Sequence, residues 1–385
     1  MKIIHIITKF HEMYGAQRHA VECMKNHLQN GHQCLAIAGT DGEATNTIKL
    51  LGIEVITIAS IKNAYNPFFD TKAIASIVSI IKEYQPNLVI SHSSKAGVLA
   101  RIACYKTKTP NIFTVHGWPF ENGTPFYQKV VALAVERLLI PFSDSYVCVS
   151  NYTKEFGLSK LPLSKSRVYA CPNMHEKKEK PYLQSKTLQH NVLMVGGFRA
   201  QKDHLTALRA LRIIIEANKI PSIHFTFVGD GPKRCVIENF ITENNLSSFV
   251  TLVGETKEID TYYSNADIVI LPTYYEGLPL SLIEALQNGI PVIATNTGGI
   301  NEIVFDNENG NLIQVEDETA LAAHITNYYL NDKISQLSSN ARKVYEKYYG
   351  YDIISKKLND VMDTSLRNSV FAKKKEVINQ VSMEF

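Results

Sequence analysis

Two glutamates eight positions apart flank the predicted start of a helix. Glu276 precedes this helix, and Glu284 falls on its second turn, with Pro279 at the first helical position. Proline is common there because its missing N–H would have had no partner. The first-turn amides of a helix bind anions, and carboxylates accept hydrogen bonds from hydroxyl groups. This combination fits a ligand with a diphosphate between two sugars. Periodicity alone leaves open that Glu276 is a loop residue and Glu284 a solvated helix position.

Two cations occupy a predicted strand-to-helix turn in "VGGFRAQKDHLTAL", residues 195–208. Asp203, directly after Lys202, is the predicted cap of the helix. A lysine at such a turn can offset the negative charge that develops on a leaving diphosphate. Arg199 is the second cation, and we assign Thr256, which follows the predicted strand 250–254, to the same ligand. The alternative interpretation of Lys202 is a plain surface lysine.

Alternating strands and helices must position these residues. The polar segment 172–191, which has prolines and no apolar period, is a predicted linker. Stretches such as 71–84 are apolar at helical spacing, and strand-helix alternation gives a mostly parallel sheet covered by helices. We therefore predict an α/β protein with two Rossmann-like domains, 1–171 and 192–349, and a ligand cleft at the carboxyl ends of the strands. The predicted strands span 3–8, 34–39, 54–58, 88–91, 112–115, 146–149, 192–197, 224–229, 250–254, 267–272 and 291–295.

The spacing of the two glutamates in "EGLPLSLIEALQNGIPVIATNTGGINEIV" resembles the EX7E signature of glycosyltransferase family 4. This family contains retaining enzymes of the GT-B fold, among them bacterial surface-polysaccharide glycosyltransferases. The resemblance implies that Glu276 contacts the hydroxyls of the donor sugar and that Glu284 binds the ribose. The backbone amides of Gly277 and Leu278 would then bind the diphosphate.

The resemblance extends over most of the chain. It assigns domain 1–171 to the acceptor and domain 192–349 to the nucleotide-sugar donor, and it implies that a helical tail, 350–385, returns to the first domain. Gly298, Gly299 and Glu302 match the family pattern GGxxE. We interpret this match as a structural loop and the start of a helix.

The chain departs from the family pattern in two places. The usual arginine five residues before the lysine is replaced by Gly197, so Arg199 becomes the candidate for its role. The family's glycine loop after the first strand, normally GGAE, keeps Gly15 but has Tyr14 and Gln17 beside it. Gly15 lets the backbone approach the donor phosphate or the acceptor. Tyr14 is expected to narrow the acceptor entrance.

His116 ends the predicted strand 112–115. A lone histidine is more often structural, but the family places one here beside the transferred sugar. Because retention of configuration argues against a general base, we expect His116 to give positioning and electrostatic support beside Glu276 and Lys202. The sequence has no DxD metal motif. We expect a metal-independent enzyme without a cofactor, in which a helix dipole and cations replace Mg²⁺ and the nucleotide sugar is a substrate.

Aromatic residues crowd two predicted loops, and Trp118 among them is assigned to the acceptor. Two interpretations stay open: packing, or a rim that faces the acceptor or a lipid surface. Residues 1–170 hold 18 Lys and Arg against 11 Asp and Glu, a balance of +7, whereas residues 190–385 hold 18 against 24, a balance of −6. Unless this is scatter, the basic half suits a polyprenyl-diphosphate-linked acceptor at the cytoplasmic leaflet. The other aromatic residues are Tyr65, Phe68, Phe69, Phe120, Phe126 and Tyr127.

Composition excludes several classes of protein. With 385 residues, 45% hydrophobic and 20% charged, the chain fits a globular protein of two domains. It shows no signal-peptide pattern, and the most apolar run after the N-terminus, 130–142, is too short to span a bilayer. Six cysteines without CxxC spacing indicate reduced core thiols in a cytoplasmic protein. No basic run with interleaved aromatics indicates a nucleic-acid partner.

The leading interpretation is a retaining hexosyltransferase. It would move a sugar from a nucleotide diphosphate, best a UDP-sugar, to a carbohydrate or polyprenyl-diphosphate-linked glycan in surface polysaccharide or lipopolysaccharide synthesis, with peripheral association at the cytoplasmic membrane. One alternative is a GT-B nucleotide-sugar epimerase or hydrolase, which the EX7E element disfavours. Another is a catalytically silent nucleotide-sugar-binding subunit, which the intact Glu276, Glu284, Lys202 and His116 disfavour.

Overall fold

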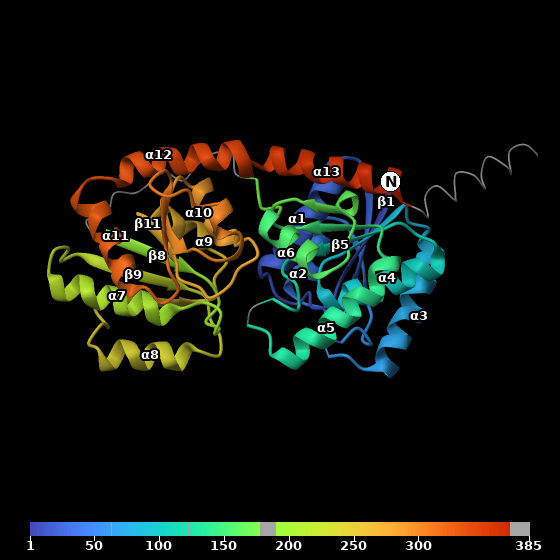
Figure 1. Ribbon diagram of the computed structural model, residues 1–385, viewed down its shortest axis with the longest axis horizontal. Coiled ribbons are helices and arrows are strands. Elements are labelled where there is room, and N and C mark those ends of the chain that lie inside the picture. The colour runs from blue at the N-terminus through green and yellow to red at the C-terminus, as the bar shows by residue number, and fades with distance from the viewer. Residues whose placement is uncertain (63, 122, 178–189, 370–385) are drawn as a thin grey trace, which may run out of the picture. The chain divides into compact units, whose positions relative to one another are not determined.

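The computed structural model describes residues 1–62, 64–121, 123–177 and 190–369. The chain divides into two compact units, each described here by itself: unit 1 holds residues 1–176 and the segment from 351 on, and unit 2 holds residues 177–350. Each unit is a parallel sheet covered by helices (Figure 1). The prediction of an α/β fold is confirmed. Residues 178–189 of the predicted linker lie outside the described residues.

The sheet of unit 1 has seven strands in the order β3-β2-β1-β4-β5-β6-β7, and its neighbouring strands pair in parallel. The strands are β1 (Lys2–Ile7), β2 (Gln33–Ala38), β3 (Glu54–Thr57), β4 (Leu88–Ser91), β5 (Asn111–Val115), β6 (Ser145–Cys148) and β7 (Val168–Ala170). The helices are α1 (Gly15–Gln29), α2 (Glu43–Leu50), α3 (Pro67–Tyr84), α4 (Ser94–Thr107), α5 (Phe126–Leu139) and α6 (Asn151–Lys160). Two short 3₁₀ turns, η1 (Ile140–Phe142) and η2 (Lys165–Arg167), complete this part of the chain.

The central strand β1 shows why the strands of this sheet are almost wholly apolar. Ile4 and Ile6 belong to a core cluster with residues of α3 and α4. Ile3 and Ile7 pack with residues of α1 in clusters of their own. Both faces of the strand are therefore buried, as is usual in parallel sheets. The strand order reverses between β1 and β4, and the carboxyl ends at such a switch point are where ligands bind.

The sheet of unit 2 has six strands in the order β10-β9-β8-β11-β12-β13, again paired in parallel. The strands are β8 (His190–Val195), β9 (Ile223–Val228), β10 (Val250–Gly254), β11 (Ile268–Leu271), β12 (Val292–Thr295) and β13 (Gly310–Ile313). The helices are α7 (His204–Ala217), α8 (Arg234–Glu243), α9 (Ile259–Ser264), α10 (Leu280–Gln287), α11 (Glu318–Leu330) and α12 (Ile334–Val344), with a 3₁₀ turn η3 (Gly298–Glu302) and a π-helical turn η4 (Tyr345–Tyr349). Here the switch point lies between β8 and β11, the strands that lead to Lys202 and Glu276.

The last described helix, α13 (Tyr351–Asn368), belongs to the core of unit 1. Its residues Ile354 and Leu358 share a buried cluster with Ile3, Cys23 and Met174. Tyr351 also donates a hydrogen bond to Gln29 Oε1 on α1, at 3.0 Å. The structure differs from the predicted linker at its first residues, because Met174 is fully buried and the segment up to Glu176 packs within unit 1.

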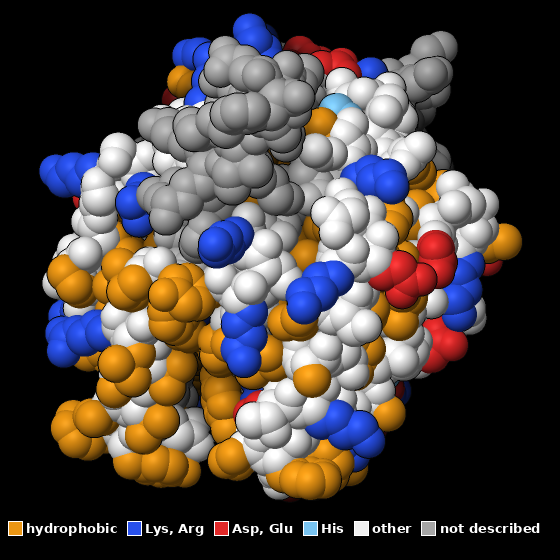
Figure 2. All heavy atoms as spheres, turned by 90° about the vertical axis from the view of Figure 1, so that its right-hand side faces the viewer, with side chains coloured by type: hydrophobic (Ala, Val, Ile, Leu, Met, Phe, Trp, Pro, Cys, Tyr) orange, Lys and Arg blue, Asp and Glu red, His pale blue; other side chains and the backbone are white. Residues whose placement is uncertain are grey.

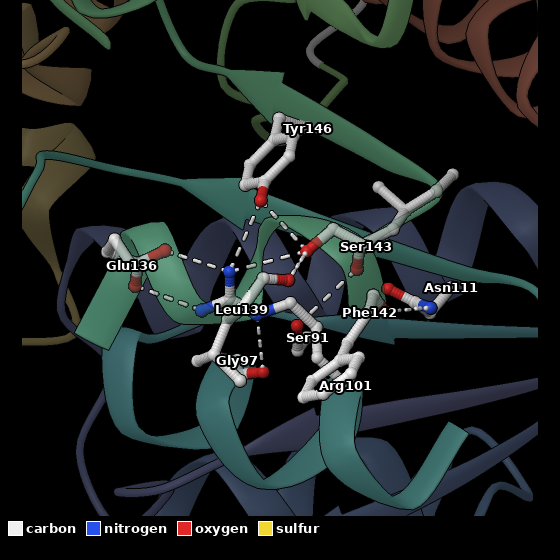
Figure 3. A network of polar contacts seen from close by, with 10 residues as sticks. Ser91, Gly97, Arg101, Asn111, Glu136, Leu139, Phe142, Ser143 and Tyr146 are labelled. Carbon is white, nitrogen blue, oxygen red and sulfur yellow. Dashed lines mark hydrogen bonds and ion pairs between the residues drawn. The ribbon is translucent and has the colours of Figure 1, made fainter. Parts of the chain in front are cut away.

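Helix α5 is fastened to α4 by a buried ion pair (Figure 3). Arg101 and Glu136 are 0% and 2% exposed, and the two guanidinium nitrogens lie 2.8 and 2.9 Å from the two carboxylate oxygens. The Arg101 Nε–H donates to the Gly97 carbonyl at 2.9 Å, and the guanidinium stacks 4.6 Å from the centre of the Phe113 ring. A fork of two parallel hydrogen bonds fixes both position and orientation. One side of α5 is thereby held against the unit while the other side faces outward.

Candidate active site

Backbone hydrogen bonds join the loops that follow β8 and β11 at the switch point of unit 2. Asp203 donates its backbone N–H to the Pro272 carbonyl, and Tyr274 donates its own to the Gln201 carbonyl, both at 3.0 Å. Asp203 also caps α7 by accepting the Thr206 N–H at 3.1 Å, as predicted from its place before the helix. These bonds place Lys202 and the residues that follow β11 side by side.

Lys202 and Glu276 form an ion pair at this junction. The Lys202 Nζ contacts Glu276 Oε1, and the side chains are 15% and 9% exposed. Thr273 donates its hydroxyl to the Gln201 carbonyl at 2.9 Å and lies 3.3 Å from the same Glu276 oxygen. Neither Glu276 nor Lys202 is a plain surface residue. The sequence alone did not indicate Thr273, which holds the carboxylate from the end of β11.

Gly298 provides the space that Glu276 needs. Its φ of +57° is unfavourable for other residues, and a Cβ here would overlap the backbone carbonyl of Glu276. Gly299 donates its N–H toward the same carbonyl at 3.4 Å. The predicted "GGxxE" loop is therefore a 3₁₀ turn whose first residues pack against the Glu276 backbone. Gly298 and Gly299 therefore act on the candidate site through the position of their backbone.

Helix α10 places Glu284 in the interior. It spans Leu280–Gln287 and so begins one position later than predicted, with Pro279 as the preceding cap residue and Asn288 as the cap at its end, before Gly289. Glu284 is 3% exposed, which excludes the solvated interpretation. Its Oε2 accepts a hydrogen bond of 2.9 Å from the hydroxyl of Tyr263, a buried residue of α9 that sequence reasoning missed.

A pocket of about 280 Å³ lies beside this junction, and several basic side chains line it. Arg199, Lys202 and Lys233 all line it. An ideal Cβ on Gly197 would lie 3.6 Å from Arg199 Nε, so the Arg199 side chain passes over the position where the family arginine would start. Lys233 was not predicted, although it follows the glycine turn 229–231. Asp203 also lines the pocket and Lys202 is paired with Glu276, but the cations still outnumber the carboxylates at this opening, which favours an anionic ligand.

The other donor-binding predictions in unit 2 do not line this pocket, and their surroundings differ. Gly277 and Leu278 lie just before α10, where amides of the first helical turn point toward the helix N-terminus. Leu278 is 5% exposed, so only its backbone could serve a ligand. Thr256 is half-buried, and its hydroxyl accepts the Glu258 N–H at 3.1 Å in the loop before α9. Within the described part of the chain, no hydrogen bond joins the Thr256 side chain to the other predicted residues.

The predicted residues of unit 1 gather near the start of α1. Gly15 is the first residue of α1, and Tyr14 is its half-buried cap. Gln17 donates its side-chain amide to the Lys9 carbonyl at 3.1 Å, which ties α1 to the loop after β1. His116 follows β5, and its ring lies 5.0 Å from that of His19, one helical turn beyond Gly15. Burial lowers the pKa of His116 to about 4, so the ring is neutral near pH 7.

Trp118 requires a correction. Its side chain is 3% exposed and packs against Gly157, with the indole N–H donated to the Thr153 carbonyl at 2.8 Å. Phe120 is buried beside it. Neither ring can form an exposed acceptor rim, because helix α6 covers them. By contrast, Phe126 and Tyr127 at the start of α5 are 82% and 68% exposed.

Comparisons with known proteins match both units. A family model described as Glycosyltransferase Family 4 matches residues 13–176, and one described as Glycosyl transferases group 1 matches residues 175–344. The chain belongs to the family 4 glycosyltransferases. It is therefore an enzyme of that class, as the EX7E resemblance predicted.

Individual relatives agree with this assignment. A UDP-Gal:alpha-D-GlcNAc-diphosphoundecaprenol alpha-1,3-galactosyltransferase of Escherichia coli is 28% identical over 307 residues, covering 76% of this chain and 79% of the relative. The capsular polysaccharide biosynthesis glycosyltransferase CapM of Staphylococcus aureus is 25% identical over 393 residues, covering 96% and 98%. The crystal structure of Anabaena HepE in complex with UDP-glucose has a TM-score of 0.81 at 20% identity, covering 94% of this chain and 100% of that one. This likeness confirms the GT-B fold.

Proposed function

We propose that this glycosyltransferase moves a hexose from a UDP-sugar, with retention of configuration, to a carbohydrate or polyprenyl-diphosphate-linked acceptor in surface polysaccharide synthesis. The observation that carries the proposal is the junction in unit 2, where Lys202 pairs with Glu276 at the mouth of a cationic pocket. The names of the relatives support it: one uses UDP-galactose and a diphosphoundecaprenol acceptor, and another acts in capsular polysaccharide biosynthesis.

The charges in unit 2 suit a donor with a diphosphate between two sugars. Lys202, Arg199 and the amides before α10 would bind the diphosphate and stabilise its charge as it leaves. A lone carboxylate beside a phosphate would be repulsive, but the ion pair with Lys202 offsets the charge of Glu276. Glu276 can then accept hydrogen bonds from hexose hydroxyls. Glu284, held by Tyr263, would do the same for the ribose.

The chemistry we propose needs no base from unit 1. The leaving phosphate accepts the proton of the acceptor hydroxyl on the face where the new bond forms, which gives retention. His116, neutral because its pKa is about 4, supports and positions the reacting sugar. The cations and the helix N-terminus take the role that a metal ion has in other transferases.

Nucleotide release from a panel of UDP- and GDP-sugars, with and without a GlcNAc-diphosphoundecaprenol acceptor, tests the proposal. We expect release of UDP that requires the acceptor, and a product that keeps the anomeric configuration of the donor. Release without acceptor would indicate an epimerase or hydrolase instead. No release from any pair would leave a binding subunit. Lys202→Ala should abolish release, whereas Lys343→Ala, an exposed lysine on α12, should not.

The acceptor proposal includes peripheral membrane binding by unit 1. No helix in the described part of the chain combines the length and apolarity needed to cross a bilayer. Figure 2 shows a face of unit 1 on which hydrophobic side chains gather with Lys and Arg side chains among them. On α5, the exposed fractions of Phe126, Val131 and Leu138 are 82%, 58% and 73%. Basic side chains beside exposed apolar rings suit an anionic lipid surface.

Co-sedimentation with vesicles of phosphatidylglycerol or of phosphatidylcholine alone tests this part. We expect binding to the anionic vesicles that weakens as salt rises, because salt screens charge. Phe126→Ser with Tyr127→Ser should reduce binding severalfold. Leu50→Ser, which removes an 89% exposed leucine at the end of α2, is the matched control. Equal binding by these variants would remove α5 from the proposed membrane surface.

A further inference from the structure

The π-helical turn η4 lies at the end of unit 2 and buries two tyrosine side chains. Tyr345 and Tyr349 are 5% and 4% exposed, whereas the three residues between them are exposed. Turns of this type are rare and often occur at functional sites. Both buried hydroxyl groups form hydrogen bonds with elements that carry the candidate site.

Tyr349 bonds to the end of the η3 turn. Its hydroxyl donates to the backbone carbonyl of Glu302, the last residue of η3, at 2.5 Å. The last carbonyls of a helical turn have no partner within that turn, and the Tyr349 hydroxyl satisfies this one. Burial raises the pKa of Tyr349, so the hydroxyl keeps its proton and can donate.

The other end of η3 contacts Glu276. Gly298 leaves no room for a Cβ beside the Glu276 carbonyl, and Gly299 donates its N–H toward the same oxygen. The turn has only five residues, and Ile300 at its centre is fully buried. A displacement of Glu302 therefore reaches Glu276, because the backbone between them is short and packed.

Tyr345 contacts helix α10 from the same turn. Its hydroxyl oxygen accepts the side-chain amide of Gln287 at 3.0 Å, and both side chains are buried. Arg342 on α12 donates to the Gln287 backbone carbonyl, and its guanidinium lies 5.2 Å from the centre of the Tyr345 ring. Gln287 follows Glu284 by three positions, so the two residues are neighbours on one turn of α10. The turn η4 thus contacts both elements that position the glutamates of the EX7E pattern.

We propose that the two tyrosines of η4 are positioning residues for the donor site. Tyr349 fixes Glu276 through η3, and Tyr345 fixes Glu284 through the last turn of α10. The hydroxyl groups set these positions, because each forms a directed hydrogen bond with one element. The catalytic part of this inference rests on the proposed function, in which Glu276 contacts the hexose and Glu284 the ribose, but the contacts with the two elements do not.

Spectra of the full-length protein labelled with ¹⁵N-glycine test these contacts without any substrate. Gly298 and Gly299 report on η3, and Gly289 reports on the end of α10. Tyr349→Phe keeps the ring and removes the hydroxyl, and it should shift the amide signals of Gly298 and Gly299. Tyr345→Phe should shift the signal of Gly289.

Tyr328→Phe is the matched control within unit 2. Tyr328 on α11 is as deeply buried, and its hydroxyl donates to Asn311 Oδ1 on β13 at 2.7 Å, not to η3 or α10. In urea unfolding this variant should lose about as much stability as Tyr349→Phe. It should shift none of the three glycine signals and should keep wild-type turnover.

Turnover and affinity give the second readout. With the UDP-sugar that the wild-type protein turns over, Tyr349→Phe should lower kcat at least threefold. Its Kd for UDP should stay within twofold, because UDP lacks the hexose that Glu276 contacts, whereas Tyr345→Phe should raise the Kd for UDP at least threefold. In a Glu276→Gln background, Tyr349→Phe should cause no further loss of kcat, because residues that act through one group are not additive.

The two readouts separate this proposal from the proposed function. Unchanged signals of Gly298 and Gly299 in folded Tyr349→Phe, or of Gly289 in folded Tyr345→Phe, would overturn the positioning of that element. If one variant does not fold, the other still decides the proposal for its own glutamate. Shifted signals with wild-type kcat and Kd would support the contacts and refute the proposed roles of the two glutamates. An equal loss of kcat in Tyr328→Phe would overturn the positioning role, because lost stability alone would then explain it.

Discussion

Replacing Gly298 by alanine tests whether the turn after β12 positions Glu276. A Cβ at this residue would lie 2.8 Å from the Glu276 carbonyl carbon and closer still to its oxygen, and φ is +57°. Left-handed backbone costs an alanine about 1–2 kcal/mol. Moving the Glu276 backbone away costs about 1–3 kcal/mol more, the usual range for overpacking. We therefore expect Gly298→Ala to destabilise the protein by about 2–5 kcal/mol.

Gly52→Ala is the matched control because it isolates the backbone strain. Gly52 has φ of +78°, and a Cβ there would meet no atom within 4 Å. Gly52→Ala should be destabilised only by this backbone strain, by about 1–2 kcal/mol, and should keep wild-type turnover. In Gly298→Ala, displacement of Glu276 by about 1 Å should lower kcat at least tenfold, since such misplacement can cost about 100-fold. Urea unfolding and UDP release measure the two effects. Equal destabilisation in both variants, with unchanged turnover in Gly298→Ala, would refute the reasoning.

Three further predictions concern the cations, the buried ion pair and acid stability. Lys202→Ala should weaken UDP binding in calorimetry about ten- to a hundredfold, because a charged hydrogen bond contributes about 1.5–3 kcal/mol. Arg199→Ala should lower kcat more than tenfold if Arg199 replaces the family arginine. Unchanged affinity in the first variant and unchanged kcat in the second would remove both residues from the donor site. Glu136→Gln should lower the unfolding free energy by about 3–5 kcal/mol by leaving the Arg101 charge unpaired, and a loss below 1 kcal/mol in urea unfolding would contradict the buried pair. His27 and His204 have pKa values lowered from 6.5 to about 3 and about 4. Because the unfolded chain binds these protons first, stability should fall as pH drops below about 6.5, by about 2 kcal/mol per histidine at pH 5; unfolding curves that coincide at pH 7 and pH 5 would contradict their burial.

The sequence predicted most strands because parallel strands are buried on both faces and form continuous apolar runs. The two strands it missed lie at sheet edges. β7 has only three residues, and β13 reads "GNLI", with a glycine and an asparagine in four positions. An edge strand has only one neighbouring strand, so its apolar signal is weak. Short edge strands of this kind are therefore hard to recognise without the fold.

The sequence predicted the site residues that belong to a motif. It did not predict contacts that the fold creates between residues far apart in the chain. The residues of the EX7E pattern and Lys202 follow from spacing, and the structure brings Lys202 and Glu276 together. Tyr263 could not be predicted, because its bond to Glu284 joins residues 21 positions apart on different helices. The bond between His5 and His92 spans 87 positions. For Trp118, an aromatic run in a loop does not reveal whether a later helix will cover it.

The return of α13 to unit 1 has a consequence for the order in which the chain matures on the ribosome. Unit 2 is continuous in sequence, from residue 177 to 350, and can complete its core as soon as it has been synthesised. Unit 1 is synthesised first, yet its apolar surface around Ile3 and Met174 stays uncovered until the helix from Tyr351 to Asn368 has emerged. Domains commonly fold during synthesis in the order in which they emerge. In this protein the second unit completes its core first. The nascent chain therefore exposes an apolar surface of unit 1 for about half of its translation.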